Sequence, residues 1–321
     1  MSSALLQSKS QSTGFFEKTE LAFIALILAV VAANIVVDIQ GPQRVAWGSF
    51  SLGMTAAVGF VLLSGYYRIA YKHVAWLGKG MMTVVLGAMC GLLTGILIHQ
   101  HMPRPEPVLT EALLKMDLWF GYDWPKAVDW VASVPFLGTF LRWVYFSSFF
   151  QIALLMIVLA YARRNRDLDA MMFTNALALI FVFIIWQGFP NLSQSTYFPI
   201  PVETAAAASL VTHSAYGAAI LELAQNGLPI VSMDRILGAV AFPSYHMVMC
   251  ALVVVFARGT TLFWPYLIIN IIMIPAILIH GAHHIADIFG GIVVMGLAMV
   301  PAYMISNYCH RSNGTANADQ P

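Results

Sequence analysis

The residues best suited to do chemistry stand in two short motifs, Phe242-Pro243-Ser244-Tyr245-His246 and His280-Gly281-Ala282-His283-His284-Ile285-Ala286-Asp287. In the second motif His283 and Asp287 are four residues apart, so on a helix they share one face and the carboxylate can reach an imidazole nitrogen. Such a carboxylate fixes the tautomer of the ring and makes its other nitrogen a better nucleophile or base. The motif therefore indicates a histidine that acts as a nucleophile or a base.

The first motif offers the groups that this chemistry would also need. His246, on a different helix, could protonate a departing alkoxide. Pro243 at a first helical position leaves free backbone N–H groups beyond it, and Ser244 adds a hydroxyl. A helix start of this kind accepts phosphate readily. Together the two motifs predict phosphoryl transfer.

The elements that carry these motifs are expected to lie in a membrane. Of the 321 residues, 60% are apolar and 10% are charged, against about a quarter charged in an ordinary soluble domain. The net charge of +1 excludes a general attraction for nucleic acid. Cys90, Cys250 and Cys309 lie far apart and show neither a disulfide nor a zinc-binding pattern.

Apolar runs of about 20 residues predict an all-α polytopic bundle of about eight transmembrane helices. The sixth run is broken by the first motif, so its helix is expected to begin only at Pro243. The eight predicted spans are 21–39, 48–67, 81–99, 141–161, 171–189, 237–257, 261–280 and 284–305.

Basic residues predict the orientation of these spans, because short loops rich in Lys and Arg stay in the cytoplasm. With eight spans, three basic loops, the basic C-terminal tail and the N-terminal lysines fall on one side, which makes both termini cytoplasmic and both motifs extracytoplasmic. These residues are Lys9, Lys18, Arg68, Lys72, Lys79, Arg163, Arg164, Arg166, Arg258 and Arg311. The histidines and Asp287 lie at the edges of predicted spans. An ionisable residue in such a position is energetically costly and favours a functional role. The alternative is that each histidine caps a helix or forms hydrogen bonds between spans.

Two long segments, 100–140 and 190–236, fall on the opposite side. The first contains Tyr122-Asp123-Trp124-Pro125 among other aromatic and acidic residues, a composition typical of a helix at the membrane interface. Residues 312–321 are expected to be disordered.

At its two motifs the chain resembles the type 2 phosphatidic acid phosphatase superfamily, whose second motif is Pro-Ser-Gly-His and whose third ends His-x-x-x-Asp. The continuation Asp287-Ile288-Phe289-Gly290-Gly291 and the tyrosine in place of the motif glycine look more like the branch of inositol phosphorylceramide synthase and its bacterial relatives. The expected organisation is a cytoplasmic tail (1–20), three accessory spans (21–99), an extracytoplasmic interfacial segment (100–140), a phosphatase- or phosphotransferase-like membrane core (141–305) and a cytoplasmic tail (306–321).

The resemblance implies that His283 is the nucleophile, Asp287 its orienting carboxylate and His246 the general acid. The superfamily has a further motif upstream of these two, a lysine followed by Arg-Pro, and it is absent here because Leu97 stands where the lysine should precede Arg104-Pro105. The Ser-Arg that should precede the third superfamily motif is replaced by Ala276-Ile277. The phosphate-binding cations are therefore missing from their usual places. The candidate phosphate-binding residues are Ser244, Tyr245, Arg142 and Arg235, with an anchoring role at the interface open for both arginines.

The predicted function is that of an integral membrane enzyme, expected in a bacterial inner membrane, that transfers a phosphoryl group from a lipid phosphate through a phosphohistidine. With water as acceptor it is a phosphatase, and with a hydroxyl it is a phosphotransferase. Neither a metal nor an organic cofactor is expected, because histidine supplies the nucleophile and fixed donors hold the charge. Two alternatives remain open: a haem or metal protein using His213, His246, His280, His283 and His284, and a transporter or flippase with a polar path.

Overall fold

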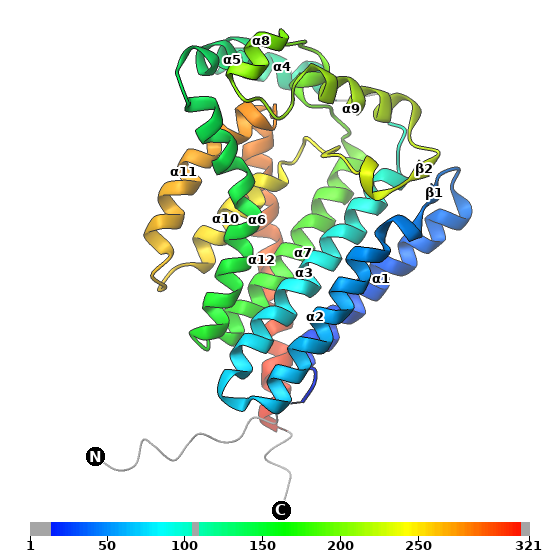
Figure 1. The fold of residues 1–321 in the computed structure, drawn as a ribbon, viewed down its shortest axis with the longest axis vertical. Helices are drawn as coiled ribbons and strands as arrows, with labels where there is room; N and C mark the ends of the chain where they lie inside the picture. Colours follow the sequence, from blue (N-terminus) through cyan, green and yellow to red (C-terminus); the bar gives the residue numbers. More distant parts are fainter. Residues whose placement is uncertain (1–13, 105–108, 316–321) are drawn as a thin grey trace, which may run out of the picture.

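A computed structural model describes residues 14–104 and 109–315 of the chain. Residues 1–13, 105–108 and 316–321, which include Lys9, Pro105 and the last six residues of the predicted disordered tail, lie outside the described ranges. The described part is an all-α bundle in which long helices run from one end to the other (Figure 1).

Seven helical segments of the described chain are long and apolar enough to cross a membrane. Each of them overlaps one predicted span, and only the sixth predicted span has no counterpart among them. Their helices are α1 (Lys18–Gln40), α2 (Ser51–Ala70), α3 (Ala75–Gln100), α6 (Leu137–Tyr161), α7 (Asn165–Gly188), α11 (Phe263–His280) and α12 (Ile285–Thr315), and the turns η1 (Trp47–Phe50) and η2 (Lys72–Val74) extend the starts of α2 and α3. The prediction of a polytopic helical bundle is confirmed.

The predicted sixth span is shorter than expected, because α10 is helical only over Tyr245–Phe256. Its 12 residues rise about 18 Å at ~1.5 Å per residue, against a hydrocarbon core of about 30 Å. Ser244 forms its N-cap, so the helix begins at Tyr245, two residues after the start at Pro243 expected from the sequence. Residues 237–244 run outside any helix instead of forming the first half of a span.

Short elements cover one end of the bundle (Figure 1). They come from the two long segments predicted to lie outside the spans. These elements are α4 (Thr110–Trp119), α5 (Trp124–Ser133), η3 (Gln194–Thr196), α8 (Val202–Ala207), α9 (Ser214–Asn226) and η4 (Met233–Arg235), together with a parallel pairing of β1 (Arg44–Val45) with β2 (Ile230–Val231). The polar motifs at the starts of α10 and α12 lie below this cap.

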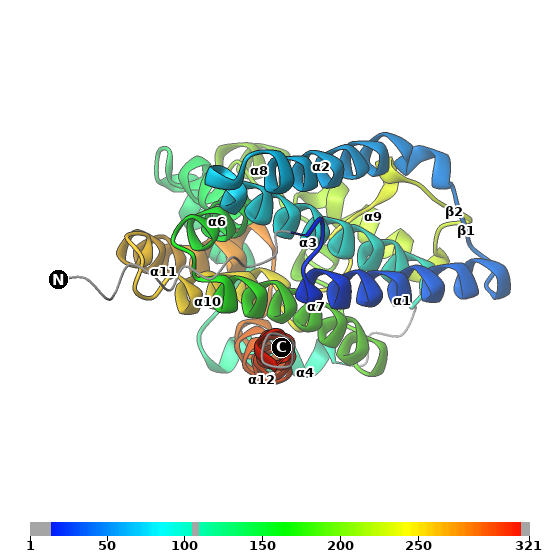
Figure 2. The same cartoon turned by 90° about the horizontal axis from the view of Figure 1, so that it is seen from below.

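α3 lies between the α1–α2 side and helices α6 and α7, while α12 packs along α7 (Figure 2). The main core is formed by buried apolar side chains such as Phe23 on α1, Leu86 on α3, Leu155 on α6 and Met171 on α7. α12 continues to Thr315. The prediction of a disordered tail is therefore wrong for residues 312–315.

At the uncapped end, the starts of α1 and α7 and the end of α12 share a buried ionic cluster. The guanidinium of Arg68 lies 2.6 Å from both Glu17 and Glu20, and the ammonium of Lys79 lies 2.5 Å from Glu17 and 3.2 Å from Asp169. His310 on α12 completes it, with its Nε2 2.9 Å from Asp169. We call these six residues the ionic cluster; they join α1, α2, α3, α7 and α12.

Candidate active site

His283 and Asp287 form a buried pair at the start of α12. His283 Nδ1 lies 2.9 Å from Asp287 Oδ2, and the same oxygen accepts a hydrogen bond from the backbone N–H of His284 at 2.9 Å. The carboxylate therefore caps α12 while it holds one ring nitrogen of His283. This leaves His283 Nε2 as the free nitrogen, 3.3 Å from Ser244 Oγ.

The start of α10 is fixed to the start of α12 by backbone contact. The N–H of Ser244 donates to the carbonyl of Asp287 at 3.0 Å, and Ser244 Oγ accepts from the N–H of Met247 at 3.4 Å. A Cβ at Gly291 would lie 2.5 Å from the Ser244 carbonyl oxygen, so only glycine allows this approach. The Gly-Gly that follows Asp287 thus serves to bring the two motifs together.

His246 projects from the first turn of α10 and stacks on Tyr145 of α6. The ring centroids are 4.1 Å apart, and the Tyr145 hydroxyl lies 3.4 Å from His246 Nδ1. If the tyrosine donates this bond, the proton of the imidazole stands on Nε2. That buried Nε2 has no hydrogen-bond partner in the part of the chain that the structure describes.

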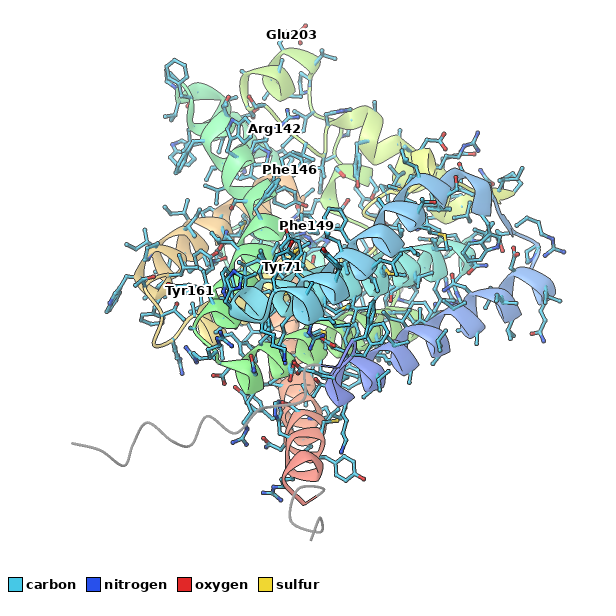
Figure 3. The ribbon with its side chains drawn as sticks, turned by 60° about the horizontal axis from the view of Figure 1, so that its bottom comes forward. Tyr71, Arg142, Phe146, Phe149, Tyr161 and Glu203 are labelled. Carbon is cyan, nitrogen blue, oxygen red and sulfur yellow. The ribbon has the colours of Figure 1, made fainter. Side chains whose placement is uncertain are left out.

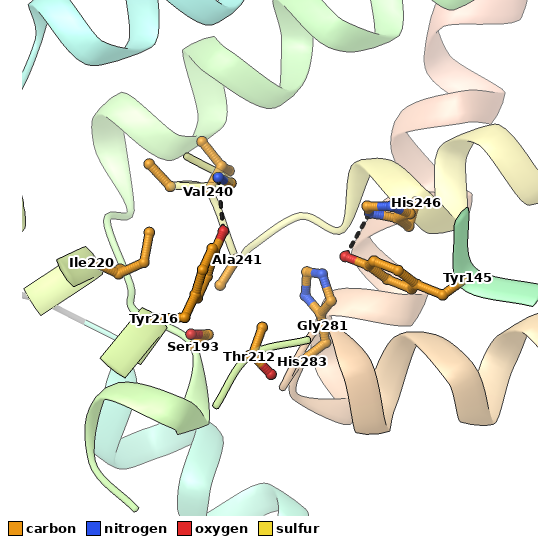
Figure 4. Close-up of a pocket in the computed structure, with 12 residues that line it drawn as sticks. Tyr145, Ser193, Thr212, Tyr216, Ile220, Val240, Ala241, His246, Gly281 and His283 are labelled. Atoms are coloured by element: carbon orange, nitrogen blue, oxygen red, sulfur yellow. Dashed lines mark hydrogen bonds between the residues drawn. The ribbon is translucent and has the colours of Figure 1, made fainter. Parts of the chain in front are cut away.

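Both histidines line one small cavity of about 60 Å³ beneath the cap (Figure 4). Figure 4 shows Tyr216 on one side of His283 and the stacked Tyr145 and His246 on the other. The remaining lining comes from Ser193, Thr212, Ile220, Gly281 and the non-helical residues 238–241. Of the described residues that line the cavity, none is a lysine or an arginine.

The structure brings together only part of the predicted site. His283 and His246 line the cavity, while Asp287 and Ser244 contact His283 without lining it. Tyr245 does not line it, because its hydroxyl donates to Asn175 on α7 at 2.9 Å.

The two arginines predicted to bind phosphate also lie away from the cavity lining. Arg142 is exposed on α6 with its guanidinium 5.8 Å from the ring centroid of Phe146, and Arg235 is exposed in η4. Figure 3 shows Arg142, Phe146 and Phe149 following one another along α6. This position suits the interfacial anchor that was the alternative for Arg142.

A second histidine–aspartate pair lies beside the first and was not predicted. His284 Nδ1 is 2.6 Å from Asp117 Oδ2 on α4, and the other Asp117 oxygen accepts from the N–H of Ile285 at 2.9 Å. Gln194 donates to Asp117 at 3.1 Å and to the His283 carbonyl at 3.2 Å. This clamp fixes the turn that carries His283 to the cap.

The Tyr122-Asp123-Trp124-Pro125 stretch has a related role. Tyr122 and Trp124 donate to the carbonyls of Leu278 and Ile279 at 3.1 Å, which satisfies the last carbonyls of α11 just before the second motif. Burial and the nearby Asp117 and Asp287 carboxylates raise the pKa of Tyr122 well above its usual value, so its phenol remains a donor.

The histidines proposed for a haem or metal centre are held apart by separate partners. His213 caps α9, His280 bonds the Gly138 carbonyl at 3.0 Å, and His284 bonds Asp117. Within residues 14–104 and 109–315, no three His, Cys, Asp or Glu side chains are grouped to hold a metal ion.

Comparison with protein-family models matches residues 111–300, more than half of the chain, to the model described as the PAP2 superfamily. No curated protein and no solved structure matches. The matched range begins in α4 and ends in α12, so it includes every residue of the two histidine–aspartate pairs.

Proposed function

The chain belongs to the PAP2 superfamily, and we propose that it is a membrane phosphatase or phosphotransferase that moves the phosphoryl group of a lipid phosphate through a phosphohistidine on His283. Members of the superfamily are phosphatases or phosphotransferases, which supports the general class. The observation that carries the proposal is a single cavity, inside an apolar helical bundle, lined by an Asp287-held His283 and by His246 from another helix.

The first step forms a bond between His283 Nε2 and phosphorus as the bond from phosphorus to the leaving alkoxide breaks. His246, acting as the imidazolium, gives its Nε2 proton to that alkoxide and is left as a neutral ring. Asp287 keeps the proton of His283 on Nδ1 and stabilises the positive charge that develops on the ring. The hydroxyl of Ser244, 3.3 Å from Nε2, helps to orient the ring.

In the second step an acceptor oxygen attacks phosphorus and the P–N bond breaks. His246, now unprotonated, takes the proton of the acceptor, which returns both histidines to their starting states. Water as acceptor gives inorganic phosphate or a phosphomonoester, and a hydroxyl compound gives a new phosphoester. The missing cations of the superfamily pattern and the Asp-Ile-Phe-Gly-Gly continuation favour the transferase branch.

The test is phosphate release by purified full-length protein from a panel of lipid phosphates, with and without alcohol acceptors. His283→Ala is expected to remove the activity, while His73→Ala, an exposed histidine in η2 at the other end, leaves it unchanged. Labelled substrate quenched in alkali should leave acid-labile label on the wild type and none on His283→Ala. Equal activity of His283→Ala and wild type would overturn the proposal.

We also place the cavity on the extracytoplasmic side, on the strength of the basic loops at the opposite end. Glu203 on α8 is exposed in the cap and Tyr71 is exposed at the other end (Figure 3). In intact cells an impermeant maleimide should label Glu203→Cys and leave Tyr71→Cys unlabelled until the cells are opened. The reverse labelling pattern would place the site in the cytoplasm.

A further inference from the structure

The proposed chemistry leaves one requirement unassigned: something must hold the phosphoryl oxygens. A lysine or arginine is the usual partner of a phosphate, yet the described lining of the cavity contains neither. The departing oxygen must lie near His246 to receive its proton, so the other oxygens face the remaining wall. That wall consists of Thr212, Tyr216 and the non-helical residues 238–241.

Thr212 supplies an unpartnered donor in this wall. It is 5% exposed, and its hydroxyl has no hydrogen-bond partner among the described residues. A buried hydroxyl without a partner is destabilising and calls for an explanation. A ligand oxygen in the cavity would satisfy this one.

The hydrogen bond that Tyr216 accepts leaves its own hydroxyl proton free to be donated. Its oxygen accepts the N–H of Gly238 at 2.9 Å, which leaves the phenolic proton for another acceptor. Burial raises the pKa of Tyr216, so the phenol keeps that proton at neutral pH.

The adjoining backbone adds two further donors. Within the described chain, the N–H groups of Val240 and Ala241 form no hydrogen bond, although Ala239 on one side bonds Leu237 and Phe242 on the other bonds Asn191. Ala239 bonding Leu237 marks a tight turn just before these two residues, and successive N–H groups in turn conformations form concave sites that bind anions. This stretch is the part of the predicted sixth span that is not helical, so its N–H groups are available because α10 begins late.

We propose that the phosphoryl oxygens bind a charge-neutral cradle formed by the hydroxyls of Thr212 and Tyr216 and the N–H groups of Val240 and Ala241, in place of lysine or arginine side chains. The proposal rests on the phosphoryl-transfer function proposed above. Fixed neutral dipoles arranged around developing charge stabilise it strongly, as in an oxyanion hole. The cradle then holds the phosphoryl group, and His246 on the other side of the cavity protonates the leaving group.

Orthovanadate, a mimic of the phosphoryl transition state, is the probe. The full-length protein in mild detergent is titrated with orthovanadate, and binding is followed by the rise in Tm. Thr212→Val and Tyr216→Phe should each weaken binding about tenfold or more, the equivalent of one hydrogen bond to a charged group. Thr212→Ser, which keeps the hydroxyl, should restore binding.

The controls separate a neutral cradle from a cationic one. Thr139→Val removes an exposed hydroxyl that bonds Ser209 outside the cavity, and it should bind as the wild type does. Arg142→Gln and Arg235→Gln should also bind normally. Loss of binding in either arginine variant, with normal binding in Thr212→Val and Tyr216→Phe, would overturn the cradle.

Failure of the cradle can be told from failure of the proposed function. If the wild type forms the phosphoenzyme and binds orthovanadate, but the Thr212 and Tyr216 variants match it, only the cradle is wrong. If the wild type neither binds orthovanadate nor forms a phosphoenzyme, the phosphoryl-transfer function fails and the cradle with it. The Tm of each variant without orthovanadate shows whether it has folded.

Discussion

The bundle buries polar side chains at both ends, in two clusters of opposite character. At the uncapped end, the acidic and basic groups of the ionic cluster are matched within 3.2 Å of one another. At the capped end the cavity is lined by histidines, hydroxyls and backbone, and none of its described lining residues is a lysine or arginine.

The difference separates a structural use of buried polarity from a functional one. Buried ion pairs hold helices together when both partners are present, and they are costly when one is lost. Both clusters leave buried atoms without a hydrogen-bond partner within the described chain, such as Glu20 Oε1 in the ionic cluster and His246 Nε2 and the Thr212 hydroxyl at the other end. His246 and Thr212 line the cavity, so their open groups destabilise the empty fold and are available to a ligand.

The largest expected effect comes from Asp287→Asn. The amide can still cap α12, but it stabilises the wrong tautomer of His283, a change that costs about 10⁴-fold in kcat in related histidine chemistry. Turnover of the best lipid phosphate should therefore collapse while the Tm stays near that of the wild type. Asp129→Asn, at an exposed position on α5, is the control; full activity in Asp287→Asn would show that the pair is structural.

Lys79→Met should have the opposite profile. It leaves the buried Asp169 without its lysine partner, and breaking a buried pair costs about 3–5 kcal/mol. The free energy of unfolding, measured by denaturant titration in detergent, should fall by this amount, and activity per folded molecule should not change. Lys72→Met, which removes an exposed lysine in η2, serves as control. A loss of kcat without a loss of stability would contradict the division between the two ends.

Asp117→Asn tests a pair that lies at the catalytic end but does not line the cavity. It removes the charge from the bond to His284 and should lower stability by about 1–3 kcal/mol, with a smaller loss of activity as the turn before α12 loosens. His284→Gln should act through the same contact, so the double variant should lose less stability than the sum of the singles. Additive losses would show that the two residues act separately.

Much of the fold and half of the site could be predicted from the sequence. The apolar runs predicted the helices because lipid-facing helices need long apolar stretches. The i to i+4 spacing predicted the His283–Asp287 contact because that contact lies within one helix. The late start of α10 followed from Pro243.

The contacts that were missed join segments far apart in the chain. Asp117 lies 167 positions before His284, and only packing of α4 against α12 brings them together. Arg142 and Arg235 were chosen by charge, but sequence does not tell which face of α6 or η4 meets the cavity. Residues 237–244 belong to an apolar run that predicted a span, yet they form no helix. Their backbone donors cannot be predicted from a side-chain pattern.

The smallest effect concerns the charge of the substrate and follows from the neutral cradle. Without a cation in the lining, a singly charged phosphodiester should be preferred to a doubly charged phosphomonoester by about tenfold in kcat/KM, the equivalent of about 1.4 kcal/mol. Phosphatidic acid and its methyl ester share acyl chains and differ in this charge, so they form a matched pair for assay. The second proton of a phosphomonoester dissociates near pH 6, so the preference should widen between pH 5 and pH 8 through the loss of monoester turnover. A preference for the monoester at pH 8 would contradict a neutral wall. Thr212→Lys would place a positive charge in the cavity, and it should shift the preference toward the monoester.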